Sequence, residues 1–313
     1  MEHYIWHLKQ GIGRNHEYAR KLLATHSRNA GLICGHDCAY CPTRSCVRTH
    51  RAFKELGVKP FTRRYAIVDP DTPVMVARDI SKLGPDDILM VCPTTDAWAP
   101  EAQKYKIGKR ILEVVAERGQ CQCRLLSKNR AMFDDLDVVK AQRGRFMVGT
   151  SITAPARKAA ELAAVERYAS PNPDRREALV GAHRRGYRTF GMLSPVLPGI
   201  VENGQDMIEL FNYIMDANPG DIWVEPVNAR GPGLIWTAED LRSAGYTDMA
   251  AAVDRIRKRD AWQEYAFELT RHAQAAAAAL GLLDKVHVLL YQNRFDPALV
   301  AALNEDELGI VWL

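Results

Sequence analysis

The chain has 313 residues, of which 47% are hydrophobic and 26% are charged, and its formal net charge is +4. This length and hydrophobic content allow a large core, which fits one barrel-sized α/β domain with an appendage. The weak positive surplus neither requires nor excludes a polyanionic partner. No run of 18 uncharged apolar residues occurs, and residues 1–21 lack the apolar run of a signal peptide. We therefore expect a cytoplasmic protein with no membrane partner.

Short apolar runs alternate with amphipathic stretches from the first strand onward. The predicted strands cover residues 29–33, 87–92, 123–127, 146–152, 188–194 and 221–227. The predicted helices between them cover residues 104–118, 131–142, 174–185 and 203–217. Six strands that alternate with helices predict a parallel sheet with right-handed crossovers. Chemistry in such sheets lies at the carboxyl ends of the strands. We therefore expect one rim to carry Cys92, Lys128, Ser151, Pro195 and the loop with Cys34, Cys38 and Cys41, which we call the cysteine loop.

The pattern changes near residue 235. Helices are predicted over residues 237–243, 248–280 and 296–304, with a short strand at 285–291. We therefore expect residues 236–313 to form a mostly helical C-terminal extension, packed on an α/β domain of residues 1–235.

Three cysteines follow the first predicted strand at C-x3-C-x2-C spacing, namely Cys34, Cys38 and Cys41. Three of the seven cysteines within eight residues are typical of a metal site in a reducing compartment, and thiolates are the ligands that iron–sulfur clusters require. Three ligands leave one iron of a [4Fe–4S] cubane open, and the amine and carboxylate of S-adenosylmethionine (SAM) can bind there. An electron passed to the sulfonium then breaks a C–S bond and yields a 5′-deoxyadenosyl radical.

Other interpretations of this loop stay open. Cys46 offers a fourth thiolate for a closed zinc site, although structural zinc sites usually consist of two separated C-x2-C pairs. His36 either tunes the cluster or is a solvent-exposed loop histidine. Tyr40 either stacks on an adenine ring or packs in the core.

The motif, with its aromatic residue before the last cysteine, resembles the signature of the radical SAM superfamily, whose usual fold is a partial (β/α)6 barrel. Further segments resemble the branch that contains spore photoproduct lyase. They are TDAWAPE at 95–101 with GKRILE at 108–113, LSKN at 126–129, GTSIT at 149–153 and SPVLPGI at 194–200. The resemblance spans about residues 27–230. It implies a radical SAM enzyme that takes its electron from a donor such as a flavodoxin or a ferredoxin.

The resemblance also assigns residues to SAM. Lys128 and Ser151 match residues that contact the SAM carboxylate, for which a cation and a hydroxyl donor are suited. Glu166 and Arg167 match an acidic–basic pair of that branch and are candidates to touch SAM. Asp96 is a candidate to bind SAM hydroxyls or substrate. The alternatives are a solvated lysine, strand packing for the serine, a solvated helix end for the pair and a turn-capping aspartate.

Cys92 ends the second predicted strand, where the resemblance implies a thiol that donates a hydrogen atom to a substrate radical. The alternative is a small buried hydrophobic residue. The lyases that repair DNA have a tyrosine after the last cluster cysteine, whereas Pro42 follows Cys41 here. The resemblance therefore does not extend to strict photoproduct lyase activity.

A basic strip follows the cysteines and consists of Arg44, Arg48, His50, Arg51, Lys54, Lys59, Arg63 and Arg64. Such a strip either binds nucleic-acid phosphates or is the solvated face of a helix. Three functions stay open: a radical SAM enzyme acting on nucleic acid or a nucleotide, a radical SAM enzyme of small-molecule or peptide biosynthesis, and a zinc-stabilised nucleic-acid-binding module that is not an enzyme.

Overall fold

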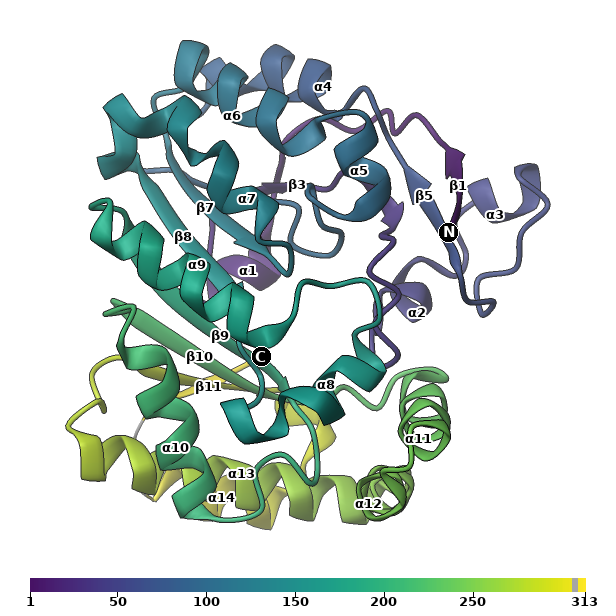
Figure 1. Ribbon diagram of the computed structural model, residues 1–313, viewed down its shortest axis with the longest axis vertical. Helices are drawn as coiled ribbons and strands as arrows, with labels where there is room; N and C mark the ends of the chain where they lie inside the picture. Colours follow the sequence, from purple (N-terminus) through teal and green to yellow (C-terminus); the bar gives the residue numbers. More distant parts are fainter. Residues whose placement is uncertain (306–308) are drawn as a thin grey trace.

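The structure is a computed structural model that describes residues 1–305 and 309–313. A curved nine-stranded sheet forms its centre, in the order β12-β11-β10-β9-β8-β7-β6-β3-β2 (Figure 1). In chain order these strands are β2 (Gly13–Arg14), β3 (His26–Arg28), β6 (Ile88–Val91), β7 (Gln122–Ser127), β8 (Phe146–Ser151), β9 (Arg188–Val196), β10 (Asp221–Pro226), β11 (Val286–Leu290) and β12 (Ile310–Trp312). Only the pair β2–β3 is antiparallel within this sheet of the described residues. The predicted parallel α/β architecture is confirmed.

The first predicted strand divides between two sheets. Residues 29–33 were expected to form it, but the parallel strand is β3, and β4 (Gly31–Ile33) lies in a separate sheet with β5 (Tyr65–Val68) and β1 (Glu2–Ile5). A Cβ atom on Gly31 would lie 2.1 Å from the carbonyl oxygen of Ile67, so only glycine lets β4 cross β5 this closely. The other five predicted strands correspond to β6–β10.

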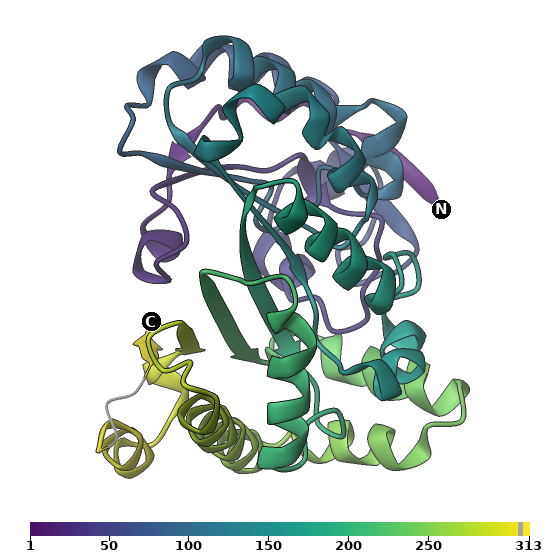
Figure 2. The same cartoon turned by 60° about the vertical axis from the view of Figure 1, so that its left-hand side comes forward.

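Helices cover the outer face of the sheet (Figures 1 and 2). In α6 (Ile107–Arg118) the predicted apolar face is fully buried, because Ile107, Ile111, Leu112 and Val115 pack on the core. The helices before β10 are α1 (His16–Arg20), α2 (Thr43–Val47), α3 (Ala52–Glu55), α4 (Thr72–Asp79), α5 (Pro100–Lys104), α6 (Ile107–Arg118), α7 (Ala131–Asp134), α8 (Ala159–Val165), α9 (Asn172–Arg184) and α10 (Gly204–Met215), with short 3-10 turns at Ile80–Lys82 and Ala156–Lys158. The predicted helix 131–142 is α7 followed by a 3-10 segment, Asp135–Arg145.

The residues after 235 add both helices and strands. The helices are α11 (Gly233–Ser243), α12 (Thr247–Arg255), α13 (Arg259–Leu280) and α14 (Pro297–Asn304), with a 3-10 turn at Gln292–Arg294. The predicted helix 248–280 is therefore two helices. Strands β11 and β12 pair in parallel with β10 and with each other, so the sheet continues across the predicted domain boundary.

The sheet is open, because β12 and β2 are its edges, and the segment around α1 lies across the opening (Figure 2). Side chains from the sheet hold this segment: Trp223 Nε1 donates to the Lys21 carbonyl at 2.9 Å, and Arg124 donates to the Leu22 carbonyl at 3.1 Å. From the segment, Tyr18 donates to the Pro93 carbonyl at 3.2 Å. The α1 segment thus ties the end of β6 to β10 and closes one side of the space inside the curved sheet. Within residues 1–305 and 309–313, every helix is too short or too polar to span a lipid bilayer.

Candidate active site

One cavity of about 380 Å³ opens at the carboxyl ends of the parallel strands. Its lining includes the cysteine loop together with Cys92, Asp96, Lys128, Ser151 and Pro195. Apart from Asp96, the sequence placed these residues on one rim, and the structure brings all of them to one cavity. The parallel sheet accounts for most of this convergence. Cys92 and Asp96 follow β6, Lys128 follows β7, and Ser151 and Pro195 lie at the ends of β8 and β9, whereas the cysteine loop follows β4 of the second sheet.

The cysteine loop is held in place by a buried carboxylate. Glu101, at the start of α5, accepts from the backbone N–H of Gly35 at 3.0 and 2.9 Å. A Cβ atom on Gly35 would lie 2.1 Å from Glu101 Oε2, so the contact requires glycine. Cys34, Cys38 and Cys41 are all half-buried and line the cavity. Burial raises the pKa of Cys38 to about 12.

The donor set and its surroundings bear on the metal that the loop suits. Cys34, Cys38 and Cys41 line an open cavity, and Cys46 lines it as well. Structural zinc sites are closed by four protein ligands, whereas iron–sulfur clusters are held by cysteine thiolates. Thiols beside a cavity fit a cluster that keeps one position open for a ligand.

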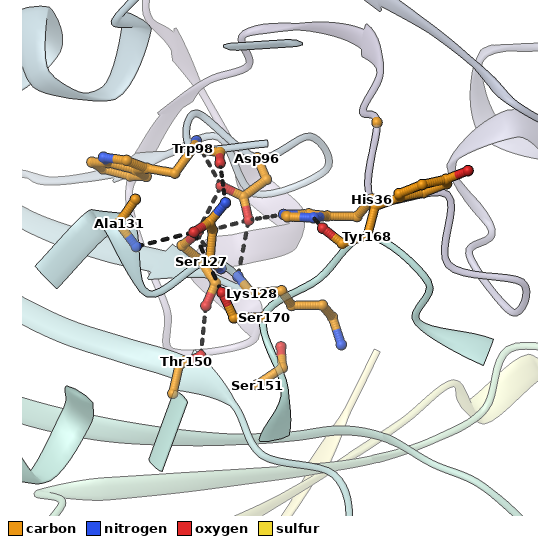
Figure 3. A network of polar contacts seen from close by, with 12 residues as sticks. His36, Asp96, Trp98, Ser127, Lys128, Ala131, Thr150, Ser151, Tyr168 and Ser170 are labelled. Atoms are coloured by element: carbon orange, nitrogen blue, oxygen red, sulfur yellow. Dashed lines mark hydrogen bonds and ion pairs between the residues drawn. The ribbon is translucent and has the colours of Figure 1, made fainter. Parts of the chain in front are cut away.

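Asp96 is the centre of a buried polar network at the end of β7 (Figure 3). Its carboxylate accepts from Ser127 Oγ at 2.9 Å and from the backbone N–H groups of Lys128 at 2.9 Å and Trp98 at 2.8 Å. His36 Nε2 lies 2.8 Å from Asp96 Oδ2. These contacts fix the cysteine loop to the ends of β6 and β7.

His36 is buried, with 2% of its surface exposed, so its interpretation as a solvent-exposed loop histidine is wrong. Burial alone lowers the pKa of His36, but Asp96, with help from the Tyr168 carbonyl and Glu101, outweighs it and raises that pKa. Conversely, burial raises the pKa of Asp96, but His36 and the N–H groups of Trp98 and Lys128 together outweigh it and lower that pKa. The pair is therefore a charged one that orients the loop between Cys34 and Cys38.

A second buried network is centred on Glu166, just behind the cavity wall. Lys128 Nζ donates to Glu166 Oε1 at 2.6 Å and to the Tyr40 hydroxyl at 2.7 Å, and Tyr40 in turn donates to Glu166. Arg175 donates to Glu166 Oε2 at 2.5 Å and to the Ser151 carbonyl at 2.7 Å. Burial by itself raises the pKa of Glu166, but Arg175 and Lys128 outweigh it and lower that pKa to about 2. The network holds the Lys128 ammonium at the cavity.

The predicted pair Glu166 and Arg167 points in two directions. Glu166 joins Lys128, whereas Arg167 donates to Asp240 of α11 at 2.6 Å. Arg63 contacts the same carboxylate at 2.9 Å. Neither Glu166 nor Arg167 lines the cavity. Glu166 thus acts on the cavity through Lys128, and Arg167 anchors α11.

Cys92, which directly follows β6, and Ser151, the last residue of β8, both line the cavity. Cys92 has a left-handed backbone conformation, with φ of 56°, and is 3% exposed. Left-handed non-glycine residues are uncommon and concentrate at functional sites. Burial raises the pKa of the Cys92 thiol, which therefore keeps its proton at neutral pH.

Two cations of the basic strip, Arg44 and Arg63, form ion pairs inside the protein. Arg44 is 6% exposed and contacts Asp37 Oδ1 at 3.5 Å, and Arg63 contacts Asp37 Oδ2 at 3.5 Å. Arg44 also lies over the ring of Tyr65, 4.6 Å from its centroid. These two arginines hold the cysteine loop against the three-stranded sheet of β1, β5 and β4, and they are not free to bind phosphates.

The opposite wall of the cavity carries a polar network that the sequence interpretation missed. Lys21 Nζ donates to the Tyr291 hydroxyl at 3.0 Å and lies 3.1 Å from Glu17 and 3.9 Å from Glu225. Ser194 donates to Glu225 at 2.7 Å. No local pattern marks these residues, because they come from α1, β9, β10 and the end of β11.

Comparison with known proteins finds likeness in structure alone. No family model matches the chain, and no curated protein matches its sequence. The structure of a point mutant of spore photoproduct lyase is 16% identical, covers 91% of this chain and 81% of its own, and has a TM-score of 0.59. A mutant of that lyase with bound AdoMet and dinucleoside spore photoproduct is 13% identical, with the same coverage and a TM-score of 0.57. The chain has the fold of spore photoproduct lyase.

The resemblance inferred from short motifs is thus confirmed in the fold. The likeness extends beyond the span of about residues 27–230, because the match covers 91% of the chain. Pro42, which departs from the tyrosine of the DNA-repair lyases, lines the cavity next to Cys41. Arg175 is a further residue that the sequence interpretation missed; as a lone cation on the buried face of α9, beside Leu179, it could have been found from the helical pattern.

Proposed function

We propose that the chain is a radical SAM enzyme in which Cys34, Cys38 and Cys41 hold a [4Fe–4S] cluster. The observation that carries this proposal is the convergence of three thiols from one short loop with Lys128 and Ser151 on one cavity. Three thiolate ligands would leave one iron of the cluster open for SAM. A solved structure of the same fold with bound AdoMet supports this assignment.

The chain's own residues prepare a SAM-shaped site. Lys128 and Ser151 bind the SAM carboxylate through a charge-assisted and a neutral hydrogen bond. Tyr40 and Glu166 keep the Lys128 side chain extended at the cavity edge, 2.7 and 2.6 Å from its ammonium. Asp96 fixes the loop that presents the cysteines. When bound, the cluster and SAM supply a one-electron cleavage of a C–S bond and a 5′-deoxyadenosyl radical that abstracts hydrogen from the substrate.

Cys92 is the proposed hydrogen-atom donor to the substrate radical. It lines the same cavity as the cysteine loop, and burial keeps its S–H bond intact at neutral pH. Its uncommon backbone conformation at the end of β6 supports a functional position.

The substrate class that we propose is a nucleic acid or a nucleotide, in a lyase reaction or a modification. Support comes from the solved lyase structures of this fold, two of which hold a dinucleoside spore photoproduct. The alternative is a small molecule or peptide of a biosynthetic pathway, and the modest cavity of about 380 Å³ favours a compact reacting group in either case. A flavodoxin or a ferredoxin would supply the electron.

The test is release of 5′-deoxyadenosine by oxygen-free, reconstituted protein given dithionite and SAM. We expect release by the wild type and none by Cys34→Ala, which also loses the brown chromophore and cluster iron. Cys46→Ala is the matched control, because Cys46 is the fourth thiolate of the zinc alternative. Retained iron and activity in Cys46→Ala support the proposal, whereas full cluster iron in Cys34→Ala contradicts the ligand assignment.

A further inference from the structure

A second concave site lies beside the candidate active site, between α12, α13 and the loops that follow β10 and β11. We name it the basic cleft. It has a volume of about 450 Å³, and five cationic side chains line it: Arg230, Arg257, Lys258, Arg259 and Arg294. They come from three separate places in the chain, namely the loop after β10, the break between α12 and α13, and the turn after β11 (Figure 1). Convergence of cations from distant segments is not the pattern of an ordinary solvated helix face.

Two of the five cations form ion pairs with aspartates, and Arg230 lies over the ring of Tyr291, 6.0 Å from its centroid. Arg257 lies 3.3 Å from Asp254, and Arg259 lies 3.3 Å from Asp296, both as exposed pairs of the kind that contribute little. Arg230, Lys258 and Arg294 make no ion pair within residues 1–305 and 309–313. Mutual repulsion of unpaired cations costs stability, and an anionic ligand in the cleft would relieve it.

The floor of the cleft is well ordered by packing. Trp262 of α13 is 7% exposed, and its Nε1 donates to the Val227 carbonyl at 2.8 Å. Its ring lies 5.6 Å from that of Phe295, centroid to centroid. One buried indole therefore fixes the loop that carries Arg230 and the turn that carries Arg294 against the same helix. The backbone segments that carry the cations are thus held in place before a ligand arrives, which lowers the entropic cost of binding.

The basic cleft adjoins the cysteine-lined cavity, and Arg230 lines both of them. A small pocket of about 20 Å³ lies between the two. It shares Ala229, Trp262 and Arg294 with the cleft, and Glu225, Pro226, Asn228 and Tyr291 with the cavity. A charged group bound at Arg230 would therefore lie at the border of the two sites.

We propose that the basic cleft binds phosphate groups of the substrate while the reacting part of the same molecule occupies the cysteine-lined cavity. This inference rests on the proposed function for the role of the cavity. Four of the five cations are arginines, whose planar forks match phosphate oxygens in pairs. The source is either a nucleoside monophosphate or the backbone of a single strand, and the cleft has room for more than one charged group.

The test measures binding and radical chemistry separately, on the reconstituted wild type and on a double variant, Lys258→Ser with Arg294→Ser. The matched control is Arg118→Ser with Lys140→Ser, which removes the same charge from exposed positions before β7 and β8, at the amino-terminal edge of the sheet. Fluorescence anisotropy follows a labelled single-stranded 12-mer and a labelled nucleoside monophosphate from 50 to 300 mM salt. A poly-glutamate peptide of equal charge serves as a competitor.

We expect the cleft variant to bind at least tenfold more weakly than the wild type at 50 mM salt, and the control variant to match the wild type. For the 12-mer, the slope of log K against log salt should fall by about 1.4, since each neutralised strand phosphate contributes about 0.7. Binding of the 12-mer alone assigns the cleft to a strand, and binding of both ligands assigns it to a single phosphate.

Two results overturn the proposal: no binding of either ligand, or displacement by poly-glutamate at equal concentration. Release of 5′-deoxyadenosine is scored on the same wild-type preparation. Phosphate binding without that release supports the basic cleft and contradicts the radical function. Release without phosphate binding supports the radical function and contradicts the basic cleft.

Discussion

The two walls of the cavity differ in how their residues are distributed along the chain. On one wall, three thiols within eight residues face Lys128 and Ser151 at the ends of β7 and β8. On the other wall, Lys21 meets Glu225 and Tyr291, which lie about 200 and 270 residues later in the sequence. The first wall therefore contains a short sequence motif, the three closely spaced cysteines, which a chain that binds a cluster in this way must keep. The second wall exists only once the sheet has curved and α1 has crossed its opening, so it is where substrate preference can change without disturbing the cofactor.

The largest effect is expected from Glu166→Gln, which breaks the support of the first wall. The substitution leaves Arg175, 1% exposed, without its carboxylate partner. Removing one partner of a buried ion pair costs about 3–5 kcal/mol. Urea unfolding at pH 7 should show this loss, and a variant as stable as the wild type would contradict the assigned network.

The same variant has a pH signature. Because the pKa of Glu166 lies near 2 in the folded protein, below its ordinary value of 4.5, its stabilising contribution is complete above pH 4.5 and is lost as the pH falls toward 2. The wild type should therefore lose more stability than Glu166→Gln across that interval. Equal acid sensitivity of the two proteins would show that Glu166 is not held in its charged form.

A matched pair of lysine substitutions separates the two walls. Lys128→Met should weaken SAM binding by about ten- to a hundredfold, because a hydrogen bond to a charged group contributes about 1.5–3 kcal/mol. Lys21→Met removes the same charge from the opposite wall and should leave SAM affinity within about threefold of the wild type. Equilibrium dialysis of SAM against the oxygen-free proteins measures both, and equal losses in the two variants would erase the distinction between the walls.

The smallest effect on the cofactor is expected from Cys92→Ala. Cluster iron and 5′-deoxyadenosine release should persist, since the thiol is not a cluster ligand in this account. With an identified substrate, Cys92→Ala should differ from the wild type in turnover or in product distribution. Liquid chromatography with mass detection measures both. Loss of the cluster in this variant would assign Cys92 to the metal or to the core and end its role as a hydrogen donor.

The sequence sufficed for much of the fold and for the first wall. Five of the six predicted strands appear as β6–β10, because continuous apolar runs bounded by turns are typical of strands buried on both faces. The prediction of the first strand was wrong, because its apolar residues belong to β4. The strand that pairs in parallel with β6 is β3, which consists of the polar residues His26, Ser27 and Arg28. The break between α12 and α13 was missed, because Ile256 to Lys258 continue the helical pattern.

Side-chain partners were the least predictable feature. Glu166 and Arg167 are neighbours in sequence, yet one joins Lys128 and the other joins Asp240. Solvent exposure was one of two interpretations of His36, and it is wrong because His36 is buried in contact with Asp96, sixty residues away. Such pairings depend on tertiary approach, which no local pattern encodes.

Electron paramagnetic resonance of the reduced, oxygen-free protein, recorded before and after addition of SAM, tests the central claim most directly. If three cysteines hold the cluster, we expect a reduced [4Fe–4S] signal whose shape changes on binding of SAM at the iron that lacks a cysteine ligand. An iron-free, silent sample that contains one zinc ion per chain would contradict the claim.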